Sequence, residues 1–169
     1  MDDGKRLLCR LVSVLLDYPD EKNLNAAAEA AGVVEEMPAD AREKLGAFLA
    51  YLRKTPLLTL QEEYTRTFDL NPGVCLNLTY HKWGDDRKRG AALADLKNLY
   101  RDNGYEISGE ELPDYLPMVL EFLSVCPENT QFPGPGLYVD QFPVIASRLR
   151  EMQSPYTGLF EILDSVLRR

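Results

Sequence analysis

The apolar residues of this chain recur at helical spacing, and prolines or glycines interrupt them at short intervals. Between Leu7 and Leu15, leucine and valine stand three or four residues apart until Tyr18-Pro19-Asp20 ends the pattern. This helix is expected to end there because proline disfavours a helical residue before it. No segment carries a convincing strand pattern, so the chain is constrained to pack helix against helix.

The same spacing predicts further helices along the whole chain. Asp20 is placed to cap a helix that ends near Gly32, and Pro38 with Asp40 opens the next one. Further helices are predicted over residues 60–68, 84–103, 109–126, 137–152 and 156–167. In the helix 109–126, Pro113 and Pro117 are expected to lie in the first turn or to kink the helix. A long loop is predicted over residues 127–136. We therefore predict an all-α fold, a single-domain helical bundle of about eight helices over residues 1–169.

The charge balance of the chain limits the kind of partner it can bind. It has 19 Lys and Arg against 27 Asp and Glu, a net charge of -8. Such a surface disfavours nucleic-acid phosphates as the main ligand, so no nucleic acid is expected among its partners. A basic peptide suits it better, because an acidic surface speeds encounter with cationic partners.

The cysteines and the N-terminal segment favour the cytoplasm. Cys9, Cys75 and Cys126 are an odd number, lie far apart and form no Cys-x-x-Cys pair, so neither a disulfide framework nor a zinc knuckle is indicated. The apolar stretch 7–16 is too short to cross a bilayer and lacks a small-residue cleavage site. We therefore expect a cytoplasmic protein with no integral membrane segment.

The sequence lacks the groups that most catalysis requires. His81 is the only histidine, so neither a metal site with several histidine ligands nor a nucleophile with a histidine base is supported. No Walker loop and no Gly-x-Gly-x-x-Gly occurs. Paired carboxylates such as Glu62-Glu63 are expected to be solvated helix-face charges. We predict no enzyme, no catalytic residue, no metal and no bound cofactor.

Aromatic and apolar side chains gather in the segment 63–85, which holds the only tryptophan and the only histidine. One interpretation makes Tyr64 and Phe68 core residues of a helical stripe. The other makes the segment a protein-binding surface, because aromatic side chains with one polar group commonly anchor interfaces. The residues predicted here to contact a peptide are Tyr64, Phe68, Leu76, Leu78, Tyr80, His81 and Trp83.

A second segment, Leu112-Pro113-Asp114-Tyr115-Leu116-Pro117, is bracketed by two prolines. Asp114 at a helix start is explained equally well as a cap or as the anion that receives a basic group of a bound peptide. In the second case Tyr115 stacks or hydrogen-bonds beside it, and Leu116 belongs to the same peptide-binding site.

Four segments together resemble one known family, the nitrate reductase delta-subunit (NarJ-type) assembly chaperones, within the wider group of redox enzyme maturation chaperones (TorD/DmsD-like). In order, they are residues 15–20 (Leu-Leu-Asp-Tyr-Pro-Asp), 63–69 (Glu-Tyr-Thr-Arg-Thr-Phe-Asp), 81–90, which contains Arg87-Lys88-Arg89-Gly90, and 111–117 (Glu-Leu-Pro-Asp-Tyr-Leu-Pro). This resemblance covers most of the chain and adds Arg87 to the candidate peptide-binding residues.

The resemblance implies an all-helical, system-specific chaperone. Such a protein binds the N-terminal segment of a molybdoenzyme catalytic subunit, here that of respiratory nitrate reductase, and holds it for molybdenum cofactor insertion. Members of this family commonly have histidine where this chain has Tyr115, so a role that needs an imidazole there does not carry over. Relatives also continue past the equivalent of Val166 with a charged tail.

Several alternatives remain open at the level of the sequence. The main alternative to a nitrate reductase chaperone is a maturation chaperone for another twin-arginine-exported molybdoenzyme, of the dimethyl sulfoxide or trimethylamine N-oxide reductase type. A nucleotide-binding or hydrolytic protein and a permanent subunit of the mature enzyme are weaker alternatives. A homodimer is also left open.

Overall fold

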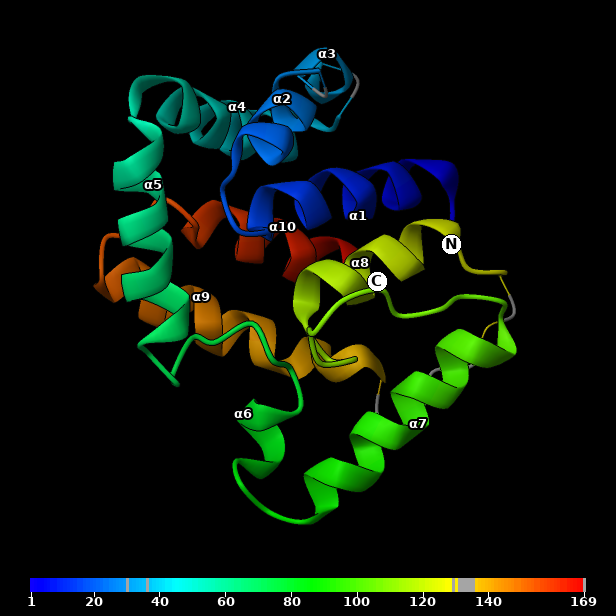
Figure 1. Ribbon diagram of the computed structural model, residues 1–169. Helices are drawn as coiled ribbons and strands as arrows, with labels where there is room; N and C mark the ends of the chain where they lie inside the picture. Colours follow the sequence, from blue (N-terminus) through cyan, green and yellow to red (C-terminus); the bar gives the residue numbers. More distant parts are fainter. Residues whose placement is uncertain (30, 36, 129, 131–135, 169) are drawn as a thin grey trace.

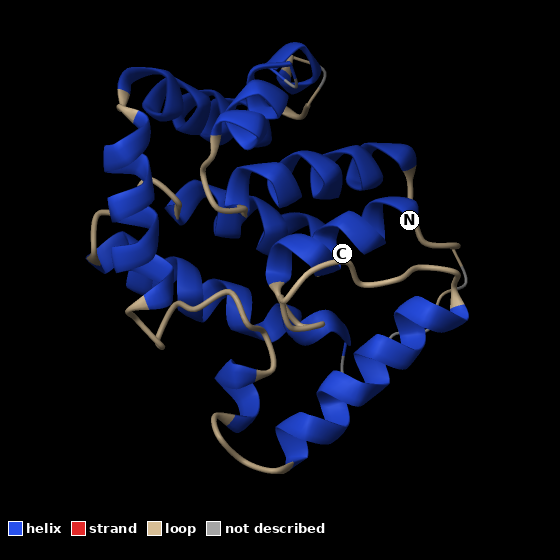
Figure 2. Cartoon of the chain, in the orientation of Figure 1, coloured by secondary structure: helices blue, strands red, loops and turns tan. Residues whose placement is uncertain are grey.

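The chain folds into helices joined mostly by short connections, and the computed structural model describes residues 1–168 except 30, 36, 129 and 131–135 (Figure 1). Figure 2 shows helices and loops but no strand over this part of the chain. The α-helices are α1 (Asp3–Leu16), α2 (Glu21–Glu29), α3 (Ala31–Val34), α4 (Ala39–Lys54), α5 (Leu57–Tyr64), α6 (Tyr80–Trp83), α7 (Lys88–Asp102), α8 (Leu116–Val125), α9 (Phe142–Glu151) and α10 (Thr157–Leu167). Within the described residues, eight of them have eight residues or more, which confirms the predicted all-α bundle.

The pair α1 and α8 forms the middle of the bundle. The Asp2 carboxylate caps α1 by accepting a hydrogen bond from the Lys5 backbone N–H at 2.8 Å. Of the described helix pairs, α1 and α8 share the most extensive contact, and Leu16 and Leu120 there are 0% exposed. Burying such side chains is the main favourable contribution to folding.

Helix α10 packs against α9, α4 and α1, and Figure 1 shows α4 above α1 and α9 below α10. Tyr156, just before α10, is 1% exposed and lies at the centre of an aromatic cluster. Its ring centroid is 5.0 Å from that of Phe48 on α4 and 4.8 Å from that of Phe68. Edge-on contacts of this kind fix the relative position of helices that are distant in the sequence.

The predicted stripe of Leu60, Tyr64 and Phe68 is confirmed as buried, but the helix that carries it changes type. After α5 the chain continues as a π-helical turn, η1 (Thr65–Asp69). A π-turn adds a residue to the helical repeat and rotates the following side chains. Tyr64 and Phe68 remain in contact, with ring centroids 5.0 Å apart.

The helix predicted from residue 84 begins later, at Lys88. The Asp86 side chain accepts a hydrogen bond from the Lys88 backbone N–H at 2.8 Å and starts α7 there. Gly84 has φ of +53°, a left-handed conformation that glycine adopts without strain, and it ends the short helix α6. The sequence pattern did not predict α6, because four residues are too few to show periodicity.

Of the helix predicted over residues 109–126, only the second half is helical, as α8. Pro113 therefore lies before the helix and not in its first turn, where it was predicted. The segment before α8 pairs instead with residues 76–78, since Leu116 N–H donates to the Leu76 carbonyl at 2.8 Å and Leu78 N–H donates to the Asp114 carbonyl at 3.1 Å. Pro117 lies in the first turn of α8, as predicted, where its missing N–H costs nothing. A longer helix would place Pro117 in its interior, where it is disfavoured.

Two other features bear on the predictions from sequence. The predicted loop 127–136 falls largely on residues 129 and 131–135, which lie outside the described residues. In the part of the chain that is described, no helix combines the length and the apolar character needed to cross a membrane.

Truncation of Leu120 tests the central role of the α1–α8 contact. Leu120→Ala removes a fully buried side chain, and we expect the free energy of unfolding to fall by about 2 to 5 kcal/mol. Leu58→Ala is the matched control, because Leu58 is 67% exposed, and it should change stability by less than about 0.5 kcal/mol. Urea denaturation followed by circular dichroism measures both. Similar losses for both variants would contradict this packing.

Candidate functional site

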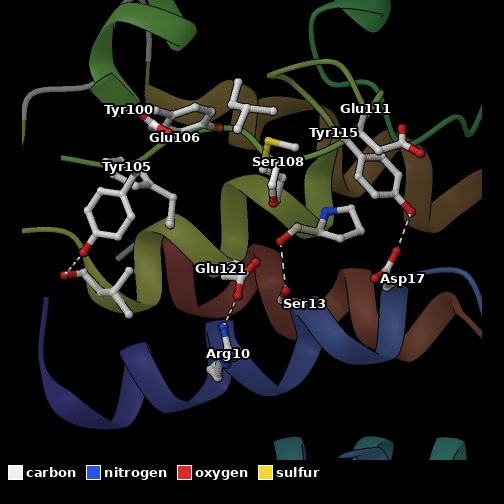
Figure 3. A pocket seen from close by; sticks show the side chains of 15 residues that line it. Arg10, Ser13, Asp17, Tyr100, Tyr105, Glu106, Ser108, Glu111, Tyr115 and Glu121 are labelled. Atoms are coloured by element: carbon white, nitrogen blue, oxygen red, sulfur yellow. Dashed lines mark hydrogen bonds and ion pairs between the residues drawn. The ribbon is translucent and has the colours of Figure 1, made fainter. Parts of the chain in front are cut away.

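A groove of about 390 Å³ runs along α1 and α8 (Figure 3). Its lining mixes apolar and aromatic side chains with carboxylates, and ligand sites are typically concave and mostly apolar with a few placed polar groups. The lining residues are Arg10, Ser13, Asp17, Tyr100, Tyr105, Glu106, Ile107, Ser108, Glu111, Tyr115, Pro117, Met118, Glu121, Phe122 and Val125.

The floor of the groove is built by the antiparallel helices α1 and α8. The Ser13 hydroxyl donates to the Pro117 carbonyl at 2.9 Å and so links α1 to the first turn of α8. One turn further along, the Arg10 guanidinium pairs with the Glu121 carboxylate. Both of these side chains are about half exposed, at 53% and 56%, so their pairing contributes little to stability and is open to exchange with a ligand.

The roof is the non-helical segment 105–111, which follows one glycine in left-handed conformation, Gly104, and contains another, Gly109. Gly104 has φ of +80° and Gly109 has φ of +120°, and other residues adopt these angles only with strain. The Tyr105 hydroxyl donates to the Val125 carbonyl at 3.4 Å, and its ring lies 5.2 Å from that of Phe122. These contacts hold the roof over the apolar part of α8.

Tyr115 closes one end of the groove. Its hydroxyl donates to the Asp17 carboxylate at 3.1 Å (Figure 3). The same hydroxyl lies 2.8 Å from the Tyr64 hydroxyl. Burial, reinforced by the Asp17 charge, raises the pKa of Tyr115, so its phenol remains a neutral donor. Tyr115, Tyr64 and Asp17, from three of the family-like segments, therefore meet at one point.

The structure corrects the predicted role of Asp114 as the receptor for a basic group of a peptide. This carboxylate is 0% exposed and accepts hydrogen bonds from the Thr79 backbone N–H at 3.0 Å, the Thr79 hydroxyl at 2.5 Å and the Asn77 amide at 3.0 Å. Arg89 of the same chain lies 3.6 Å from it. The cationic partner of Asp114 is therefore internal, because a buried charge must be paired and hydrogen-bonded.

Most other predicted peptide-binding residues lie outside the groove. Five belong to the core, with at most 4% exposure: Tyr64, Phe68, Leu76, Leu78 and Leu116. On α6, Tyr80, His81 and Trp83 are half-buried, and Arg87 is exposed just before α7. Of the predicted set, Tyr115 alone is among the residues that line the groove.

His81 and Cys75 lie together but do not form a nucleophile and base. The His81 Nε2 atom is 2.7 Å from the Cys75 carbonyl and 3.8 Å from the Cys75 sulfur. Burial lowers the pKa of His81 and raises the pKa of the Cys75 thiol. Both shifts disfavour the imidazolium–thiolate pair that such catalysis uses. Among the described residues, no three His, Cys, Asp or Glu side chains could hold a metal ion together.

The sequence alone did not identify several residues of the roof and floor as part of a binding site. Arg10, Met118 and Glu121 stand in helices where nothing in the pattern marks them. Tyr100 belongs to the predicted helix 84–103, and Tyr105 lies between that helix and the one predicted from residue 109. The one available signal was the glycine pair at 104 and 109, which brackets a segment too short for a helix.

Comparison with known proteins places this chain in a family. The family model described as "Nitrate reductase delta subunit" matches residues 34–162. The chain belongs to the nitrate reductase delta subunit family. This agrees with the four family-like segments, two of which, 63–69 and 111–117, supply Tyr64 and Tyr115.

Individual members of the delta subunit family and a solved structure agree with this assignment. The chain is 32% identical to the nitrate reductase molybdenum cofactor assembly chaperone NarJ of Escherichia coli (strain K12), over 90% of this chain and 66% of that protein, so it spans just under two thirds of that relative's length. It is also 32% identical to a Bacillus subtilis (strain 168) protein named "Probable nitrate reductase molybdenum cofactor assembly chaperone NarJ", over 92% of this chain and 85% of that one. A crystal structure of a proposed redox enzyme maturation protein from Archaeoglobus fulgidus matches with a TM-score of 0.69 and 26% identity, covering 97% and 94% of the two chains.

The buried position of Asp114 predicts a structural role that is open to measurement. Asp114→Ala leaves Arg89 and Thr79 without their partner, and we expect a loss of about 3 to 5 kcal/mol, which for a chain of this size lowers the melting temperature by roughly 6 to 20 °C. Asp85→Ala, at an exposed position, is the control and should melt like the unaltered protein. Equal melting temperatures for the two variants would show that the Asp114 cluster does not hold the fold.

Proposed function

We propose that this protein is a cytoplasmic assembly chaperone that binds the N-terminal segment of the catalytic subunit of respiratory nitrate reductase and holds it for molybdenum cofactor insertion. Membership of the delta subunit family supports this proposal, together with the names of the relatives in Escherichia coli and Bacillus subtilis. The observation that carries it is the α1–α8 groove, a concave surface that combines apolar side chains with carboxylates.

The dimensions and chemistry of the groove suit a short polypeptide segment. From Pro117 to Val125 the α8 floor extends about 12 Å at 1.5 Å per residue, which is two turns of a bound helix. Met118, Phe122 and Val125 supply apolar contacts, and the roof residues supply polar ones. This is the arrangement by which helices are bound in grooves.

No catalytic step is needed for such a protein to act. A chaperone shifts the equilibrium of its client only through a difference in affinity for two states of that client. A segment that is accessible in the unfinished subunit and enclosed in the finished enzyme provides this difference. On this proposal the protein is not an enzyme, and the chemistry of cofactor insertion belongs to other factors.

A charge placed at the apolar end of the groove tests this function. Val125 lines the groove and is 48% exposed, so Val125→Glu should fold normally. We expect it to weaken binding of a synthetic peptide, the first twenty residues of the nitrate reductase catalytic subunit from the same organism, by about 1 to 3 kcal/mol. Calorimetric titration measures the affinity, and reductase activity in a complemented deletion strain measures maturation.

Val144→Glu is the matched control for this experiment. Val144 is 44% exposed on α9 and does not line the groove, so this variant should bind the peptide and support maturation like the unaltered protein. If the unaltered protein fails to bind the peptide, or if Val125→Glu matures the reductase fully at equal protein level, the proposal is refuted.

A further inference from the structure

The apolar floor of the groove is partly covered by the roof. Phe122 lines the groove but is only 4% exposed, and two tyrosine rings lie against it. Their centroids are 4.7 Å from that of Phe122 for Tyr100 and 5.2 Å for Tyr105. The Tyr105 hydroxyl also reaches the last carbonyl of α8, that of Val125 (Figure 3). A bound segment can therefore contact Phe122 widely only where one of these rings gives way.

Of the two rings, that of Tyr105 is held weakly. Tyr100 is 2% exposed and its hydroxyl donates to the Pro113 carbonyl at 2.8 Å, so this ring is fixed in the core. Tyr105 is 37% exposed, and its hydroxyl bonds to one described residue, Val125, at 3.4 Å. This hydrogen bond is neutral and longer than most O–H···O bonds, which makes it weak. Because Val125 is 48% exposed, water can replace the bond when the ring leaves.

The rest of the roof is attached even more loosely. Within the described residues, no hydrogen bond or ion pair engages residues 106–111, and of these six only Ile107 packs against the core. Gly104, with φ of +80°, precedes the roof and Gly109, with φ of +120°, lies within it. Glycine moves between left-handed and other conformations at little steric cost. Few buried contacts and an exposed backbone are typical of segments that open locally.

We propose that the roof is a lid latched by Tyr105. Residues 105–111 swing away on Gly104 and Gly109 to admit the bound segment, and they then close on that segment instead of on α8. The inference rests on the proposed function and adds how access to the groove is controlled. In the closed state the Tyr105 ring covers the apolar floor, so the lid competes with the segment. The observed affinity is then the intrinsic affinity reduced by the fraction of molecules whose lid is open.

Removal of the Tyr105 hydroxyl tests the latch. Tyr105→Phe keeps the ring but loses the hydrogen bond to Val125, so the open fraction should rise. Association with the twenty-residue peptide defined above should become about two- to fivefold faster, and the affinity should rise by the same factor. Stopped-flow fluorescence with a dye-labelled peptide measures the rate, and calorimetric titration measures the affinity. Tyr18→Phe is the matched control and should bind like the unaltered protein, because Tyr18 is 42% exposed, does not line the groove and has no hydrogen bond from its hydroxyl to a described residue.

Gly109→Ala tests the hinge independently of the latch. A methyl group there meets no other heavy atom within 4 Å, so the change acts through the φ of +120°, which disfavours the closed path of the roof. This variant should also associate faster with the peptide. Gly46→Ala is its control, because Gly46 lies within α4, is equally free of close contacts and does not have a left-handed φ.

The outcomes separate this inference from the function on which it rests. If the unaltered protein binds the peptide but Tyr105→Phe and Gly109→Ala associate no faster than their controls, the lid is refuted and the proposed function stands. Weaker binding by Tyr105→Phe has the same meaning, because the hydroxyl would then be a contact of the segment and not a latch. If the unaltered protein does not bind the peptide at all, both are refuted.

Discussion

The buried Asp114 carboxylate holds together the part of the structure on which the groove depends. It accepts hydrogen bonds from Thr79 and Asn77 and faces Arg89, so it joins the segment after η1, the start of α7 and the start of α8. An isolated carboxylate in such a place is very costly, and its full set of partners is what makes the position stable. Tyr115, the next residue, is thereby held at the end of the groove.

The groove follows from this arrangement and from two glycines. Residues 114–116 pair with residues 76–78, so the chain before Leu116 does not continue α8. The segment 105–111 lines the groove above α1 and α8 instead. Gly104 and Gly109 provide the left-handed turns that this path requires. A long helix over the same residues would fill this space, so the non-helical segment is the feature that leaves a surface for a partner.

Much of the fold could be predicted from the sequence, because it depends on local signals. Helical spacing indicated α1, α4 and α10, and it indicated α8 as the second half of a helix predicted over 109–126. Contacts between distant segments left no such signal. The π-turn after α5 and the pairing of residues 76–78 with 114–116 arise from tertiary packing, which periodicity does not encode.

The candidate site, like the fold, could be predicted only where local sequence signals mark its residues. The segments 15–20, 63–69 and 111–117 were identified as family-like, and Asp17, Tyr64 and Tyr115 from these segments do meet. From the sequence, the Asp114 carboxylate is equally suited to binding a ligand and to a structural role inside the protein. Only its burial distinguishes these two roles, and the burial of a single polar residue cannot be inferred from its neighbours in sequence. Arg10 carried no signal because charged residues on helices are usually solvated, and Glu111 was identified only as part of the family-like segment 111–117, without a role of its own.

Amide hydrogen exchange with and without the catalytic-subunit peptide tests most directly whether the α1–α8 groove is the binding surface. Binding should slow exchange in residues 104–112 of the roof and at the exposed faces of α1 and α8, and should leave α6 and residues 76–83 unchanged. Slower exchange confined to α6 and residues 76–83, with the roof unaffected, would contradict the assignment of the groove and return the binding surface to the aromatic segment.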